Sequence, residues 1–176
     1  MVTLNEALSG SIRTISLQRV NRETGQTTSE TFRVRIPTGV HEGQIIRVPG
    51  KGEPGYNNGP AGNLYLRVRF AQHPDFRVRG TDLYYDLELA PWEAVLGTTV
   101  TIPALDVPVT VRVPAGSMKG QQLRVRGKGL PAGNDQRGDL YATISIDVPS
   151  QVSDEERKLW QQLAEKSHFN ARNEQK

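Results

Sequence analysis

The chain has 176 residues, of which 36% are hydrophobic, and its net charge at neutral pH is +3. This length predicts one domain or two small ones, and a domain below about 80 residues has a thin core that gains from packing or pairing. The absence of cysteine excludes disulfides, thiolate zinc sites and cysteine nucleophiles, and it agrees with a reducing compartment. No apolar run approaches the roughly 18 residues of a membrane span, and the first residues do not resemble a signal peptide, so we expect a cytoplasmic protein with no membrane partner.

The positive residues are dispersed along the chain. Single arginines occur in strand-like alternation at Arg33, Arg35, Arg67, Arg69, Arg77 and Arg79. A solvated strand face explains them better than a nucleic-acid patch, because clustering is the stronger electrostatic signal of nucleic-acid binding. The composition alone therefore identifies no partner.

The chain contains two copies of one sequence unit. Residues 33–52 read RVRIPTGVHEGQIIRVPGKG, and residues 110–129 read TVRVPAGSMKGQQLRVRGKG. Eleven of these twenty positions are identical, where chance gives roughly one. Shorter matches flank this run, with EALSGS against EAVLGT before it and GNLYLRV against GDLYATI after it. We therefore expect two tandem homologous domains at residues 1–78 and 79–150, followed by a helix and tail at residues 151–176.

Each copy is predicted to be mainly β. Apolar residues alternate with polar ones in several short segments, which is the period of strands with one buried face. These apolar sets are Phe32, Val34 and Ile36; Leu64, Leu66, Val68 and Phe70; Leu83, Tyr85, Leu87 and Leu89; Val107, Val109, Val111 and Val113; and Leu140, Ala142, Ile144 and Ile146. Short strands bounded by Gly, Pro and Asn predict small β-sandwiches or partly closed barrels, and Thr24-Gly25-Gln26 is the expected tip of a hairpin.

Helices are expected at three places. Residues 4–8 and 91–96 each read as about one turn, ended by Gly10 and Gly97. The third helix, over residues 153–167, begins with the capping-box pair Ser153 and Glu156. Its apolar residues recur at helical spacing and form a stripe of Leu159, Trp160, Leu163 and Ala164.

The sequence gives little support for catalysis or for a metal site. The three histidines, His41, His73 and His168, lie far apart and in no catalytic motif, and we expect no catalytic residue, metal or cofactor. The two Gly-Lys-Gly loops invite a phosphate-binding interpretation. However, strands and prolines flank them in place of a helix, so tight turns with glycine at positive φ are the better interpretation.

One strand has a face whose role the residues leave open. In the segment at residues 11–17, Arg13, Ile15 and Leu17 share one face, and Ile12, Thr14 and Ser16 share the other. Ile15 and Leu17 could simply belong to the core, which is the more common case. Alternatively, they could present an apolar surface to a peptide partner.

Together these motifs resemble the C-terminal domains of DnaJ-type (Hsp40) co-chaperones. The resemblance rests on Ile36-Pro37-Thr38-Gly39, Gly43-Gln44, Gly50-Lys51-Gly52, Gly62-Asn63-Leu64-Tyr65 and His73-Pro74-Asp75-Phe76, and it covers residues 2–168. The chain has no J-domain and none of the CxxCxGxG repeats of the zinc-bearing subclass. It therefore resembles a fragment of the second, CbpA-like subclass that begins at the first C-terminal domain.

The resemblance implies a co-chaperone that binds unfolded polypeptide and delivers it to Hsp70. It implies a homodimer joined through Leu159, Trp160 and Leu163, and a shallow groove on the first domain that holds an extended peptide by strand addition. Carried over by position, the groove residues are Arg13, Ile15, Leu17, Phe76 and Val2. The resemblance also implies that Arg13 helps bind the acidic C-terminal tail of a DnaK-type Hsp70, because arginine offers carboxylates a bidentate fork. A DNA-associated binding protein, an enzyme of unknown type and a purely architectural dimerisation arm remain the alternatives.

Overall fold

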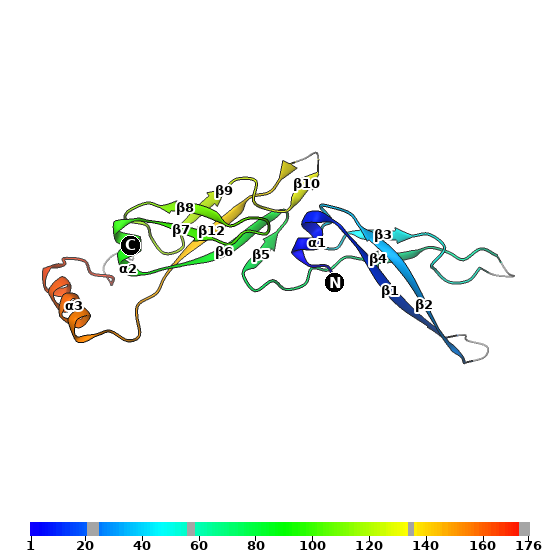
Figure 1. Cartoon of the computed structure of the whole chain (residues 1–176), viewed down its shortest axis with the longest axis horizontal. Coiled ribbons are helices and arrows are strands. Elements are labelled where there is room, and N and C mark those ends of the chain that lie inside the picture. The colour runs from blue at the N-terminus through cyan, green and yellow to red at the C-terminus, as the bar shows by residue number, and fades with distance from the viewer. Residues whose placement is uncertain (21–24, 56–58, 134–135, 173–176) are drawn as a thin grey trace.

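The computed structural model of the protein describes residues 1–20, 25–55, 59–133 and 136–172. The molecule is elongated, and two β-rich units lie end to end along its long axis (Figure 1). The first unit contains α1 (Leu4–Ser9), β1 (Ser11–Val20), β2 (Thr27–Ile36), β3 (Ile45–Val48) and β4 (Leu64–Arg67). The second unit contains β5 (Phe76–Arg79), β6 (Asp82–Leu89), α2 (Pro91–Leu96), β7 (Thr98–Ile102), β8 (Val109–Val113), β9 (Gln122–Val125), β10 (Pro131–Gly133), β11 (Gln136–Arg137) and β12 (Leu140–Ile146). The last helix, α3 (Asp154–Lys166), follows it at the end of the molecule beyond α2 (Figure 1).

The prediction of a mainly β chain with short helices is confirmed. The sheets are small: β5, β6, β12 and β9 form one of four strands, and β1–β2, β3–β4, β7–β8 and β10–β11 form pairs. These sheets are consistent with tandem β-sandwich domains. The strand β5 spans the expected domain boundary after residue 78 and pairs with β6.

The strands of the first unit follow the predicted alternation. The hairpin β1–β2 pairs ten residues on each side, from Ser11 opposite Ile36 to Val20 opposite Thr27. Because residues directly opposite each other in an antiparallel pair share a face, the buried side chains of Phe32, Val34 and Ile36 define the inner face of this hairpin. The predicted tip at Thr24-Gly25-Gln26 includes Thr24, which lies outside the described residues.

The sequence duplication is repeated in the backbone. Helices α1 and α2 both end at a glycine with positive φ, where Gly10 N–H donates to the Glu6 carbonyl and Gly97 N–H to the Glu93 carbonyl. The Gly43 N–H donates to the Val68 carbonyl at 2.9 Å, and the equivalent Gly120 N–H donates to the Ile144 carbonyl at 2.8 Å. The two copies therefore share these turns and the short helix ends.

Two expectations about element boundaries have different outcomes. The C-terminal helix is confirmed, with Ser153 and Glu156 forming the predicted capping box. The predicted strand face from Val107 to Val113 is wrong at its first residue, because Val107 precedes β8 and is exposed. The Val107 N–H donates to the Asp106 carboxylate, and Pro108 has no N–H to offer a ladder, so pairing begins only at Val109. Within the part of the chain that the structure describes, no helix is long and apolar enough to cross a membrane.

Candidate peptide-binding groove

A groove of about 330 Å³ lies on the first unit between the inner face of β1–β2 and the strands β3 and β4. Most of its wall is apolar, and its lining includes Val2, Ile15, Val34, Ile36, Leu66 and Val68. Arg13 and Arg67 are the charged residues in the lining. A shallow apolar depression with cationic groups in its wall can accept an extended chain that carries apolar side chains.

The face of β1 that carries Arg13, Ile15 and Leu17 is the inner one. Arg13 lies opposite the buried Val34, and Ile15 lies opposite the buried Phe32. Ile15 and Leu17 are themselves only half-buried. By contrast, Ile12 on the outer face keeps 69% of its surface exposed. The strand thus places Ile15 in the groove wall, with Leu17 one step further along the same face.

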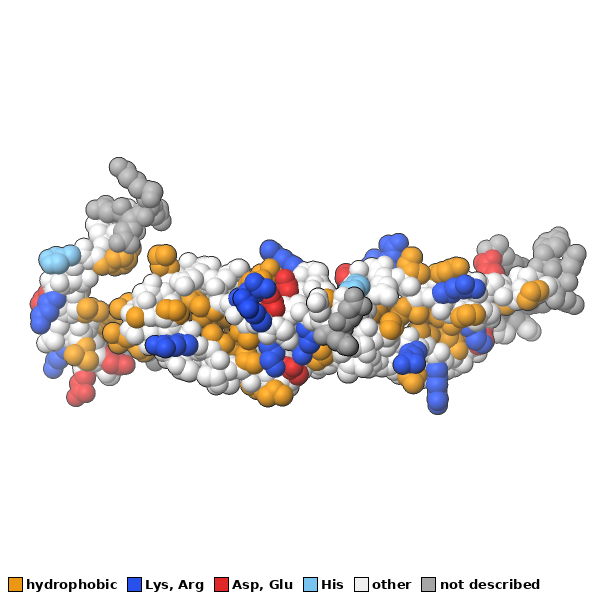
Figure 2. All heavy atoms as spheres, turned by 90° about the horizontal axis from the view of Figure 1, so that it is seen from above, with side chains coloured by type: hydrophobic (Ala, Val, Ile, Leu, Met, Phe, Trp, Pro, Cys, Tyr) orange, Lys and Arg blue, Asp and Glu red, His pale blue; other side chains and the backbone are white. Residues whose placement is uncertain are grey.

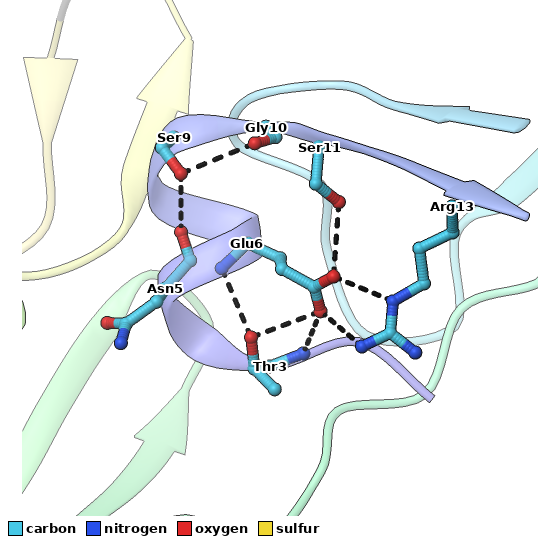
Figure 3. Close-up of polar contacts among 7 residues, drawn as sticks. All are labelled: Thr3, Asn5, Glu6, Ser9, Gly10, Ser11 and Arg13. Carbon is cyan, nitrogen blue, oxygen red and sulfur yellow. Dashed lines mark hydrogen bonds and ion pairs between the residues drawn. The ribbon is translucent and has the colours of Figure 1, made fainter.

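Arg13 is held by the acidic side chain of Glu6, which was not among the predicted groove residues. Its Nε donates to Oε1 of Glu6 at 2.6 Å and its Nη2 to Oε2 at 2.7 Å, a bidentate pair (Figure 3). The Glu6 carboxylate also accepts hydrogen bonds from the Thr3 N–H at 2.8 Å and the Ser11 hydroxyl at 3.2 Å. The Arg13 guanidinium is the main cause that lowers the pKa of Glu6 to about 2, and Glu6 in turn raises the pKa of Arg13. The capping-box spacing of Thr3 and Glu6 was the available sequence signal for this acid.

The remaining two predicted groove residues lie in different places. Val2 lines the groove and is buried, and its backbone forms an isolated parallel bridge to Phe70. Phe76 does not line this groove. It is buried beside a separate cavity of about 1220 Å³, with its ring 4.9 Å from His73 and 6.1 Å from Tyr85. The structure therefore brings together Val2, Arg13 and Ile15, but not Phe76.

The predicted dimerisation residues lie on α3 around a second, smaller hollow. Leu159 and Leu163 are exposed, and the Trp160 ring lies 6.2 Å from the Trp92 ring of α2. These four residues and Glu156 line a pocket of about 350 Å³. Trp92 was missed from the sequence, because a lone tryptophan in a one-turn helix gives no periodic signal.

The two Gly-Lys-Gly loops are turns. Gly50 and Gly127 have φ of +68° and +67°, which agrees with the turn interpretation. Lys51 forms an ion pair with Glu30, and the Lys128 Nζ lies 3.2 Å from the Asp106 carboxylate. Each lysine is therefore already paired with an acid of its own unit.

Comparison with known proteins shows what the chain is similar to. The model of the DnaJ C-terminal domain matches residues 1–149. Proteins called "Curved DNA-binding protein" from Coxiella burnetii, Pseudomonas putida and Pseudomonas syringae pv. tomato are 46%, 43% and 41% identical to this chain, respectively. These alignments cover 97–98% of this chain but only 55–56% of each relative, so the chain spans about half the length of the curated relatives that it matches. The chain belongs to the DnaJ C-terminal domain family.

Proposed function

We propose that this chain is a non-enzymatic binding module that holds segments of unfolded polypeptide and delivers them to a DnaK-type Hsp70 in the cytoplasm. The observation that carries the proposal is the apolar groove on the first unit, with Val2 and Ile15 in its wall and Arg13 beside them. Membership of the DnaJ C-terminal domain family supports a co-chaperone role for this surface.

The size of the groove suits weak and reversible capture. Burying one leucine-sized side chain contributes about 1.5–3 kcal/mol before the cost of ordering the peptide is subtracted. A groove of about 330 Å³ has room for only a few such side chains. Weak capture lets a client leave for Hsp70, and two grooves in a dimer would raise the effective affinity by avidity.

The groove is tested by titrating the chain with a fluorescent hydrophobic client peptide. We expect the double variant Ile15→Ser with Leu17→Ser to weaken binding at least tenfold while lowering the melting temperature less than a substitution in the closed core, because both side chains are only half-buried. Ile12→Ser is the matched control, since Ile12 lies on the outer face of the same strand. Equal loss of binding in both variants would contradict the assignment of the groove.

Arg13 is proposed to bind the acidic Hsp70 tail. An incoming carboxylate must compete with Glu6 for the guanidinium, which keeps the contact weak and exchangeable. We expect Arg13→Glu to reduce binding of an acidic tail peptide much more than binding of a neutral client peptide. Arg35→Glu is the control, because Arg35 is exposed and lies opposite Ile12 on the outer face. Equal loss of both peptides in Arg13→Glu would refute this role.

The helix α3 is proposed to join two copies of the chain through Leu159, Trp160 and Leu163. Leu159 and Leu163 keep 65% and 56% of their surface exposed, which is unusual for leucines on the apolar stripe of a helix. We expect Trp160→Ala with Leu163→Ala to halve the solution mass at micromolar concentration. An unchanged dimer mass would show that another surface joins the copies, and a monomeric parent chain would remove the dimer altogether.

DNA binding is the second candidate function, because the similar proteins carry the name "Curved DNA-binding protein". The chain has a net charge of +3, but Figure 2 shows its Lys and Arg side chains spread along the visible face rather than gathered in one patch. DNA binding would fall steeply with salt, whereas apolar groove capture would not. A titration with duplex DNA at low and high salt, repeated with Arg33→Glu and Arg35→Glu, separates the two functions.

A further inference from the structure

The two units meet at a packed contact between a turn and a hairpin. The turn at residues 37–40 follows β2 in the first unit, and the β10–β11 hairpin belongs to the second unit. A Cβ placed on Gly39 would lie 3.2 Å from the Pro131 Cβ and 3.3 Å from the Pro131 carbonyl oxygen. This spacing leaves little room even for a methyl group, so the turn and the hairpin lie directly against each other. Figure 1 shows β10 beside the end of the first unit that carries α1.

The turn is held firmly within the first unit. The Gly39 N–H donates to the Ala7 carbonyl of α1 at 2.8 Å. The next residue, Val40, is 1% exposed and belongs to the same apolar cluster as Leu4 and Ala7. Moving the turn away from the hairpin within its own unit would therefore break this hydrogen bond or expose Val40 to water.

The hairpin is held firmly within the second unit. Leu130, directly before β10, is 1% exposed, and its N–H donates to the Thr81 carbonyl at 2.7 Å. The Arg137 Nε donates to the Gly129 carbonyl at 2.9 Å, and its Nη1 donates to the Asp106 carboxylate at 2.8 Å. These bonds tie the base of the hairpin to the residue after Gly80 and to the loop between β7 and β8. The contact with the first unit is therefore made by a fixed part of the second.

Elsewhere the junction between the units is loosely filled. Residues 71–75, which connect the units, form neither helix nor strand. The cavity of about 1220 Å³ beside them is lined by Leu4 and His41 from the first unit and by Phe76 and Thr81 from the second. An irregular connection beside a hollow leaves room for one unit to rotate against the other. Any such rotation must slide or separate the turn from the hairpin.

The repeat supplies a matched turn without this contact. Gly116 stands at the place of Gly39 and has the same φ of +75°. A Cβ on Gly116, however, would meet no described atom within 4 Å. The conformation of the turn therefore does not by itself require a neighbour, and the contact at Gly39 belongs to the junction between the units.

We propose that the contact between the turn at residues 37–40 and the β10–β11 hairpin fixes the orientation of the first unit relative to the second. Residues 71–75 act as a hinge when this contact is lost. The chain then works as one rigid arm, with the groove of the first unit held at a constant position relative to the second unit. This inference does not depend on what the groove binds.

A disulfide between the turn and the hairpin tests whether the contact persists in solution. The chain has no cysteine, so Gly39→Cys with Pro131→Cys contains only the two introduced thiols. Their Cβ spacing of 3.2 Å lies just below the value of about 3.5–4.5 Å usual for a disulfide. We expect this variant, under mild oxidation at low micromolar concentration, to form an intramolecular bond at least about tenfold faster than Gly116→Cys with Pro131→Cys. Peptide mapping without reductant measures both rates, and equal rates would overturn the proposal.

Distances between spin labels test the orientation of the units. Gln18→Cys in β1 and Thr99→Cys in β7 provide exposed labelling sites, and dilution with unlabelled chain restricts the measurement to distances within one copy. We expect one narrow distance distribution in the labelled chain. Gly39→Leu should broaden or shift this distribution, because a leucine does not fit against Pro131. Gly116→Leu carries the same backbone strain and should leave the distribution unchanged.

A second variant weakens the contact from the other side. Arg137→Ala removes the bonds to Gly129 and Asp106 without altering the first unit, and it should also broaden the distribution. It decides the question if Gly39→Leu fails to fold. A broad distribution in the labelled chain itself would overturn the proposal, because the units would not be held. An unchanged narrow distribution in both variants would also overturn it, because something else would hold them. Failure of client binding would refute the proposed function and leave these distances unaffected.

Discussion

The two units are copies of one sequence pattern, yet equivalent residues are buried to different extents. In β12 of the second unit, Leu140 and Ala142 are fully buried. Their equivalents in β4, Leu64 and Leu66, are only half-buried. In this chain β12 lies between β6 and β9, whereas β4 pairs with β3 among the described strands. An apolar alternation thus fixes which face a strand buries, but its partner strands decide how completely.

A second contrast lies where each short helix meets its hairpin. Glu6 of α1 forms a bidentate ion pair with Arg13, the third residue of β1. In the second unit, Val100 is the third residue of β7 and stands in the place of Arg13. Val100 packs against the core and leaves Glu93 as a capping residue for Ala90. The first unit therefore has a charged side chain, Arg13, in its groove wall where the second unit has a core contact, Val100.

The largest effect expected from this comparison is in the hairpin core. Ile102 is 1% exposed, whereas its equivalent Ile15 is half-buried at the groove. We expect Ile102→Ala to cost about 2–5 kcal/mol of unfolding free energy, since it leaves a cavity in a closed core. Ile15→Ala should cost only about 1 kcal/mol, because less apolar surface returns to water.

Urea denaturation can measure the two variants separately. Both tryptophans, Trp92 and Trp160, lie outside the first unit, so their fluorescence follows the second unit. Amide exchange in β1 and β2 follows the first. Similar losses for Ile15→Ala and Ile102→Ala would mean that the groove is closed core in solution and would remove the contrast.

Much of this fold could be predicted from the sequence, because each signal was local or repeated. The capping box at Ser153 and Glu156 marked α3, and the alternation at Phe32, Val34 and Ile36 marked the inner face of β2. The duplication predicted that the elements found in one copy recur in the other. The capping box and the alternation depend on neighbours within a few residues, which is why they were reliable.

The groove could be predicted only in part. Spacing put Arg13, Ile15 and Leu17 on one face, but burial of that face depends on β3 and β4, which lie far along the chain. Phe76 was assigned by resemblance, and the structure places it beside another cavity. The Glu6–Arg13 pair and the Trp92–Trp160 contact join separate elements, so no pattern within one element could indicate them.

An intermediate loss of unfolding free energy is expected when the glycine that ends α1 or α2, Gly10 or Gly97, is substituted. Gly97 has φ +80° and ψ 154°, a region that is almost reserved for glycine. A Cβ at Gly97 would lie 2.9 Å from the Ala115 backbone nitrogen, whereas at Gly10 the nearest atom is a threonine hydroxyl at 3.1 Å. We expect Gly97→Ala to cost about 1–3 kcal/mol, with Gly10→Ala at the lower end of that range.

A control isolates backbone strain from crowding. Gly116 has φ +75°, but a Cβ there would meet nothing within 4 Å. We expect Gly116→Ala to cost about 1–2 kcal/mol from the left-handed conformation alone. If Gly97→Ala were no worse than Gly116→Ala in urea denaturation, close packing of the helix end would not contribute to the stability of the second unit.

The smallest effect is expected where the two units differ in charge. Arg13→Val gives the first unit the residue that the second unit carries. The side chains of Arg13 and Glu6 are 43% and 20% exposed, so at neutral pH the loss should stay below about 1 kcal/mol. The dependence of the stability of the first unit on acidic pH is the sharper test. The folded-state pKa of Glu6 is about 2 against an ordinary 4.5. Its stabilisation is therefore complete above pH 4.5 and is lost as the pH falls towards 2.

In Arg13→Val the main cause of the lowered pKa is gone, so the first unit should lose less stability between pH 4.5 and pH 2 than the parent chain. Amide exchange in β1 and β2 across this range measures the difference. Glu6→Gln removes the titrating group, and adding Arg13→Val to it should then leave the pH profile unchanged. If Arg13→Val alone keeps the full acid response of the parent, Thr3 and not Arg13 holds the Glu6 carboxylate ionised. An incoming acidic peptide could then bind the Arg13 guanidinium with little competition from Glu6.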